Sequence, residues 1–153
     1  AFEPQEEIAQ LWSSKRKSVC YPYVLGDKVR DIIFKVNEES HTLSSVSEGS
    51  DLANSPKSTI YNQCRLDTVL IESGITHVDF LSIDVEGYEM QVLKGLDFHE
   101  VNIVCLVLEN DKTKFGDDAL RTYMHDCGYR HVARLSGDDV FVKIKSDAEK
   151  YFL

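Results

Sequence analysis

Two acids with close spacing follow one of the strands that we expect in this sequence. Asp84 ends the expected strand at 78–84, and Glu86 follows two residues later, before Gly87. Residues two apart lie on the same side of an extended chain, and a glycine permits a tight turn into a following helix. Two carboxylates above a crevice can orient a substrate hydroxyl, accept its proton or hold a cation.

A structural role is the alternative for each of these two acids. Asp84 would then cap the next helix, and Glu86 would be an acid in its first turn, where the positive end of the helix dipole favours a carboxylate. Spacing alone leaves both interpretations open for Asp84 and favours the structural one for Glu86.

Two further strand ends carry acids, Glu3 and Glu109. An acid at the end of a strand beside a nucleotide-binding crevice can accept both hydroxyls of a ribose. The alternative for Glu3 is an acid at the start of a helix, next to Pro4 and hydrogen-bonded to backbone N–H groups. Glu109 either faces the same crevice as Asp84 or begins a loop, and we interpret Asp111 as part of that solvated loop.

Alternating strands and helices must position these ends. We expect helices at 4–17, 67–73, 87–94 and 117–127, strands at 18–25, 29–36, 78–84, 101–109, 131–135 and 140–144, and a loop at 41–58. This alternation predicts an α/β fold with a mostly parallel sheet, helices on both faces and a C-terminal antiparallel hairpin. Ligands of such sheets bind beyond the carboxyl ends of the strands.

Two local features refine this fold prediction. Asp67 stands at the expected start of a helix and is a candidate N-cap. The range 101–109 is almost continuously apolar, which predicts a strand covered on both faces, as in the middle of a parallel sheet.

The composition excludes several classes of protein. The chain has 153 residues, enough for one domain, and its net charge of −9 argues against a nucleic-acid partner. The longest apolar run, 103–108, is too short to span a membrane. The four cysteines have no CxxC or zinc-binding spacing, so we expect no zinc site and favour a reducing, cytoplasmic compartment.

Several nucleotide-binding and catalytic motifs are missing from the sequence. No two glycines are separated by a single residue, so there is no GxG loop, and there is no GxxxxGK[ST] motif. A GxSxG sequence is also absent, which leaves a hydrolase triad without support.

The segment Val78–Leu96 resembles the signature of FkbM-type methyltransferases. The shared pattern is a hydrophobic strand, then Ile-Asp-Val-Glu-Gly, then Glu, then Val-Leu-Lys-Gly, with Ser82 where the family usually has lysine. Weaker resemblances follow in the same order over nearly the whole chain, at 1–4, 25–27, 64–70 and 139–142. The family consists of S-adenosylmethionine-dependent enzymes with a Rossmann-like class I sheet.

The resemblance implies one methyltransferase-like domain over residues 1–153 that binds S-adenosylmethionine. It also implies methylation of an oxygen on a small-molecule or sugar hydroxyl. Glu3 would hold the ribose of the cofactor, and the turn Leu25, Gly26 and Asp27 would border the adenine.

The resemblance also implies roles for the two closely spaced acids. Asp84 is our first candidate for contact with the methionine part of the cofactor or with the acceptor hydroxyl, and Glu86 is the second. No residue is assigned as a metal ligand.

The first strand and glycine loop of the family precede the position of Ala1 and lie between the second and fourth strands. We therefore hypothesise that the sequence is a fragment, whose sheet would have two unpaired strand edges. Two other classes stay open. A non-catalytic methyltransferase-like scaffold is favoured by the absent glycine loop and by Ser82. A nicotinamide-dependent oxidoreductase is disfavoured by the motif at 84–95.

Overall fold

The computed structural model describes residues 1–35, 45–47, 58–110 and 119–144. The described helices are α1 (Glu6–Lys15), α2 (Leu66–Glu72), α3 (Glu89–Lys94) and α5 (Ala119–Asp126). The described strands are β1 (Val24–Leu25), β2 (Arg30–Lys35), β3 (Ser45–Ser47), β4 (Ser58–Cys64), β5 (His77–Ile83), β6 (Asn102–Glu109), β7 (Tyr129–Leu135) and β8 (Asp138–Lys143). They form two four-stranded sheets, in the orders β1-β4-β2-β3 and β5-β6-β8-β7.

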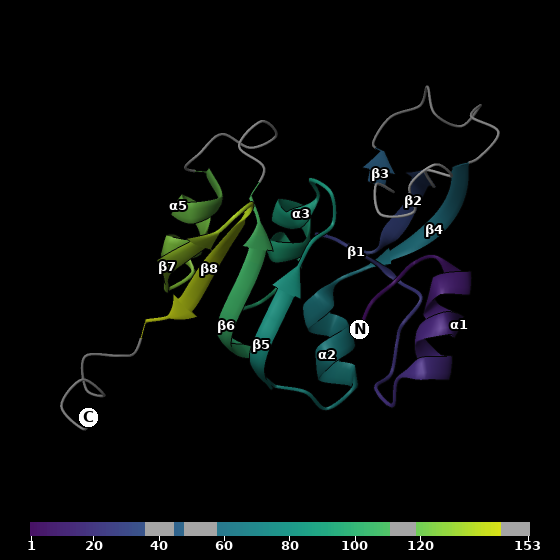
Figure 1. Ribbon diagram of the computed structural model, residues 1–153, viewed down its shortest axis with the longest axis horizontal. Helices are drawn as coiled ribbons and strands as arrows, with labels where there is room; N and C mark the ends of the chain where they lie inside the picture. The colour runs from purple at the N-terminus through teal and green to yellow at the C-terminus, as the bar shows by residue number, and fades with distance from the viewer. Residues whose placement is uncertain (36–44, 48–57, 111–118, 145–153) are drawn as a thin grey trace.

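Helix α2 lies between the two sheets in the view of Figure 1, with β5 to β8 on its left and the other sheet on its right. The core is built mainly on the β5–β8 sheet, where Leu106, Leu120 and Phe141 are fully buried. Phe2 and Leu25 pack against the same core. The N-terminal part of the chain therefore shares this core with the β5–β8 sheet.

The β5–β8 sheet brings two strand ends to one edge. β5 and β6 pair in parallel, with Ile83 opposite Leu108, while β8 and β7 form the C-terminal antiparallel hairpin that the sequence predicts. The hairpin turns through two residues, Ser136 and Gly137, and Ser136 adopts a φ of 60°. Among the described residues, β5 pairs with β6 alone.

The prediction of one mostly parallel sheet was wrong. Of the six pairings among the described strands, only β1–β4 and β5–β6 are parallel. Two of the antiparallel pairings, β2–β3 and β2–β4, involve strands that were not predicted, β3 and β4. The apolar Ile60 of β4 is 71% exposed while its polar Gln63 is buried, so the strand lacks the usual pattern of burial. Part of the expected loop at 41–58 forms β3, and the rest lies outside the described residues apart from the start of β4.

The strand expected at 18–25 is shorter than predicted. Only β1 is regular, because Pro22 has no N–H to donate to a partner strand. A single parallel bridge joins Phe2 to Tyr21, in which Tyr21 N–H donates to the Ala1 carbonyl (2.9 Å) and Glu3 N–H to the Tyr21 carbonyl (3.0 Å). This bridge places Glu3 at the end of a short extended segment.

Asp67 is not the N-cap of its helix, contrary to the prediction. Arg65 occupies the N-cap of α2, and Asp67 lies in the first turn. Its carboxylate accepts hydrogen bonds from the backbone N–H groups of Thr68 (2.6 Å) and Asp97 (3.0 Å). Asp67 therefore ties the start of α2 to the loop that follows α3.

The central strand β6 has buried side chains on both faces, as predicted. Ile103 is fully buried on one face, and Leu106 and Leu108 are fully buried on the other. Val104, on the same face as Leu106, is 43% exposed, so the cover is incomplete near the start of the strand.

We predict that Gly95→Ala destabilises the fold by about 1–3 kcal/mol. Gly95 ends α3, and a Cβ at this position would lie 2.1 Å from the backbone oxygen of Gly26. Because the clashing atom belongs to the backbone and not to a flexible side chain, the contact can be relieved only by moving the end of the helix. Urea unfolding monitored by circular dichroism measures the change.

Gly137→Ala is the matched control, since a Cβ there meets nothing within 4 Å. Equal unfolding free energies for the two variants would contradict close packing between Gly26 and Gly95.

Candidate active site

Three carboxylates meet at the carboxyl ends of β5 and β6. Asp84 follows β5, Glu109 ends β6, and Glu89 begins α3. One carboxylate oxygen from each lies within 4.8 Å of the other two. Asp84 is exposed, Glu109 is partly buried and Glu89 is fully buried. The structure thus brings Asp84 and Glu109 to one place, as their positions on neighbouring strands suggest.

The loop between β5 and α3 directs Glu89 back toward Asp84. Glu86 and Gly87 both adopt positive φ values, 55° and 98°, so the chain turns sharply there. Oε1 of Glu89 accepts hydrogen bonds from the N–H groups of Val85 (3.0 Å) and Gly87 (3.1 Å). Oε2 of Glu89 is buried and accepts no hydrogen bond from the described residues. The Glu89 carboxylate is therefore held in place through one oxygen.

The extended backbone that we expected at Glu86 is not present in the structure. The backbone at Glu86 is left-handed rather than extended, so spacing of two residues does not place it beside Asp84. Its proposed role at the site remains untested. Sequence analysis missed Glu89 instead, although this acid belongs to the family-like pattern and falls in the first turn of the expected helix.

The capping alternative for Asp84 does not describe the structure. Tyr88 is the N-cap of α3, and no side chain forms a capping hydrogen bond there. Asp84 is thus an exposed acid at the strand end without a helix-capping function.

The turn after β1 lies against α3. Asp27 accepts hydrogen bonds from Arg30 (3.5 Å) and Gln63 (3.3 Å), and the Tyr88 hydroxyl donates to Gln63 (3.0 Å). Arg30 also donates to the Tyr88 hydroxyl (3.0 Å). This network connects the predicted adenine-bordering turn, Leu25 to Asp27, to the segment that follows Asp84.

Glu3 lies apart from these contacts. Its Oε1 accepts a hydrogen bond from Gln5 N–H (2.8 Å), as the helix-start interpretation expected. Burial raises the pKa of Glu3, and the Gln5 hydrogen bond opposes this rise. Among the described residues, no hydrogen bond joins Glu3 to Asp84 or to the turn at 25–27. Ribose binding by Glu3 remains a prediction.

A buried polar cluster fixes the end of β6, and sequence analysis did not identify it. The buried Asn110, next to Glu109, donates to Asp139 (2.6 Å), which also accepts two hydrogen bonds from Arg121 (both 2.8 Å). His131 contacts the same carboxylate at 3.1 Å. These hydrogen bonds fix the end of β6, next to Glu109, which is one of the three carboxylates described above.

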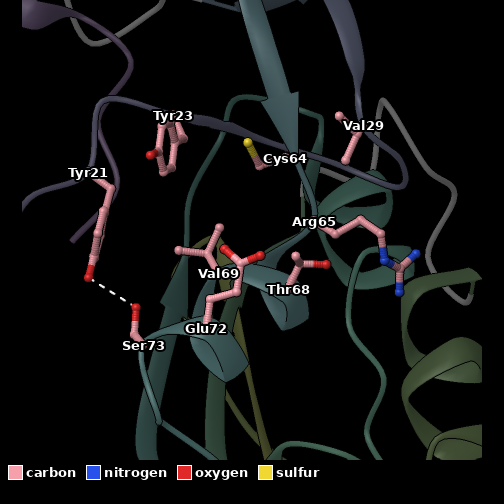
Figure 2. Close-up of a pocket in the computed structure, with 9 residues that line it drawn as sticks. All are labelled: Tyr21, Tyr23, Val29, Cys64, Arg65, Thr68, Val69, Glu72 and Ser73. Carbon is pink, nitrogen blue, oxygen red and sulfur yellow. Dashed lines mark hydrogen bonds between the residues drawn. The ribbon is translucent and has the colours of Figure 1, made fainter.

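A cavity of about 320 Å³ lies between residues 21–23 and α2, as Figure 2 shows. Tyr21 and Tyr23 line one side, and the Tyr21 hydroxyl lies 3.1 Å from the Ser73 hydroxyl on the other. Its lining contains none of the residues predicted to bind cofactor or acceptor. The cavity therefore gives no support to the predicted cofactor site.

A parallel strand pair connected through a helix, with acids at the carboxyl ends of both strands, is an arrangement in which α/β sheets bind ligands. Residues 1–131 match the family model described as the methyltransferase FkbM domain, and the chain belongs to this family of S-adenosylmethionine-dependent methyltransferases. Searches of curated proteins and of solved structures found no match. Within the described ranges, no helix has the length and apolar character needed to cross a membrane.

Proposed function

We propose that this chain transfers a methyl group from S-adenosylmethionine to the hydroxyl oxygen of a small molecule or sugar. The observation that supports this proposal best is the acid group at the ends of β5 and β6, with Asp84 open to solvent. In parallel sheets, this edge is where substrates bind. We further propose that residues 1–153 act as one domain, which the packing of Phe2 and Leu25 against the β5–β8 core supports.

We propose that residues outside the acid group bind the adenosyl part of the cofactor. A carboxylate has about four acceptor sites, so Glu3 retains capacity for ribose hydroxyls beside its bond to Gln5. We propose that the turn of Leu25, Gly26 and Asp27 borders the adenine. The bound cofactor supplies an electrophilic methyl group on a sulfonium ion.

The protein then has two tasks in the proposed reaction. It aligns the acceptor oxygen with the methyl carbon and excludes water, and such alignment can lower a barrier by about 7–11 kcal/mol. The oxygen–carbon bond forms as the carbon–sulfur bond breaks. Asp84 accepts the hydroxyl proton as positive charge develops on the acceptor oxygen. Glu86 is our second candidate for this role.

Transfer of a radiolabelled methyl group from S-adenosylmethionine to a panel of sugar and small-molecule alcohols tests the proposal. Label on an oxygen of at least one acceptor is the expected result. Calorimetric binding of the cofactor without any transfer would favour the non-catalytic scaffold. Binding of a nicotinamide dinucleotide in place of S-adenosylmethionine would favour the oxidoreductase.

We predict that Glu3→Ala weakens binding of S-adenosylmethionine by about 10- to 100-fold. The reason is the loss of hydrogen bonds from ribose hydroxyls to a charged acceptor, each worth about 1.5–3 kcal/mol. Isothermal titration calorimetry measures the affinity. Glu7→Ala removes a similar acid from the exposed surface of α1 and serves as the control. Unchanged affinity in Glu3→Ala would remove Glu3 from the cofactor site.

A further inference from the structure

We propose that Asp84, Glu89 and Glu109 form a binding site for a divalent cation that prefers oxygen ligands, such as Mg²⁺, Mn²⁺ or Ca²⁺. Carboxylates are the ligands that such hard cations take from proteins. The three residues come from the ends of β5 and β6 and from the start of α3, so the fold itself assembles the group.

The buried Glu89 is the observation that points to a ligand. Its Oε1 accepts two backbone hydrogen bonds, while Oε2 is buried and accepts none from the described residues. Buried polar atoms are nearly always satisfied by a partner, water or an ion. Two further carboxylates lie beside Glu89, and like charges repel one another. A bound cation would coordinate Oε2 of Glu89 and offset the repulsion among the three carboxylates.

The spacing of the three carboxylates suits such an ion. Oxygen ligands at 2.0–2.6 Å from a cation lie roughly 3–5 Å from one another, depending on the angle between them. The observed limit of 4.8 Å falls within this range. Asp84 is exposed, so one side of the site is open to water or to a substrate oxygen.

Catalytic use of the cation, unlike its binding, rests on the proposed function. A divalent cation beside Asp84 would bind the acceptor oxygen and favour loss of its proton. The site itself requires neither S-adenosylmethionine nor an acceptor, so it can be examined in the protein alone.

Titration of the EDTA-treated, desalted chain with Mn²⁺, followed by electron paramagnetic resonance of free Mn²⁺, tests the site. We expect one saturable site with a Kd of about 10⁻⁵–10⁻³ M, and competition by Mg²⁺ or Ca²⁺. Asp84→Asn and Glu89→Gln should each weaken binding by about tenfold or more. Asp79→Asn is the matched control, because it removes one exposed acid from the same strand, outside the acid group.

Asp84→Asn carries the test if Glu89→Gln fails to fold, because Asp84 is exposed. Absence of saturable binding, or equal losses in Asp84→Asn and Asp79→Asn, would overturn the cation site. Saturable Mn²⁺ binding without methyl transfer to any acceptor would count against the proposed function and leave the cation site standing. Methyl transfer by a chain that binds no cation would support the proposed function and overturn the cation site.

Discussion

Asp139→Asn is expected to destabilise the fold by about 3 kcal/mol, because the change removes the central acceptor of a buried ionic cluster. Asp139 is fully buried and receives hydrogen bonds from Asn110, Arg121 and Arg134. Asparagine keeps the shape but leaves two arginine charges without their carboxylate. Urea unfolding at neutral pH measures the loss.

The same cluster predicts how stability depends on pH. Burial by itself raises the pKa of Asp139, but the hydrogen bonds from Arg121 and Asn110 and the charges of Arg121 and His131 outweigh it. The pKa therefore lies well below the ordinary value of 3.8. Asp139 therefore takes up a proton more readily in the unfolded chain than in the folded one. The stabilisation of the fold by its ionised carboxylate is complete above the ordinary pKa and declines as the pH falls below it.

The difference in unfolding free energy between wild type and Asp139→Asn should thus shrink between pH 4 and the acid limit of the fold. Asp126→Ala, at an exposed acid near the end of α5, is the control and should change stability by less than about 0.5 kcal/mol. A difference that stays constant as the pH falls would contradict the role assigned to the ionised carboxylate.

Local signals in the sequence predicted the elements that depend on neighbouring residues. The α3 helix ends at Gly95, directly after the expected range 87–94. The C-terminal hairpin is also present, although its turn consists of Ser136 and Gly137 instead of the expected residues 136–139. The parallel pair of β5 and β6 follows from two apolar runs separated by a helix. Each of these signals acts within a few residues, so the sequence displays it directly.

Features that depend on distant residues were not predictable in the same way. β4 buries Gln63 because the side chain bonds to Lys28 and Tyr88, and these partners are close only in the folded chain. The Asp139 cluster likewise joins β8 to α5 and to the end of β6. At the candidate site, Asp84 was identified from its strand end, whereas Glu89 required knowledge of the left-handed turn at Glu86 and Gly87.

Asp84→Asn is expected to lower turnover by about 100-fold, which is within the usual contribution of a general base. The variant keeps the size of the side chain and loses its charge at the exposed end of β5. Binding of S-adenosylmethionine should change by less than about twofold if Asp84 acts mainly on the acceptor. Initial rates with an acceptor that the wild type methylates measure the effect, and Asp79→Asn should retain wild-type turnover. A fully active Asp84→Asn would remove Asp84 from the reaction.

The same variant separates two ways in which Asp84 can act. If its carboxylate accepts the hydroxyl proton directly, excess Mn²⁺ leaves the turnover of Asp84→Asn low, because no ion replaces the missing base. If Asp84 acts by holding a cation, the weaker site fills at high Mn²⁺ concentration and turnover recovers in part. The recovery should then follow the same Mn²⁺ concentration that saturates the variant in the binding titration. Since Glu89 and Glu109 remain as ligands, this coincidence identifies the cation as the group that activates the acceptor.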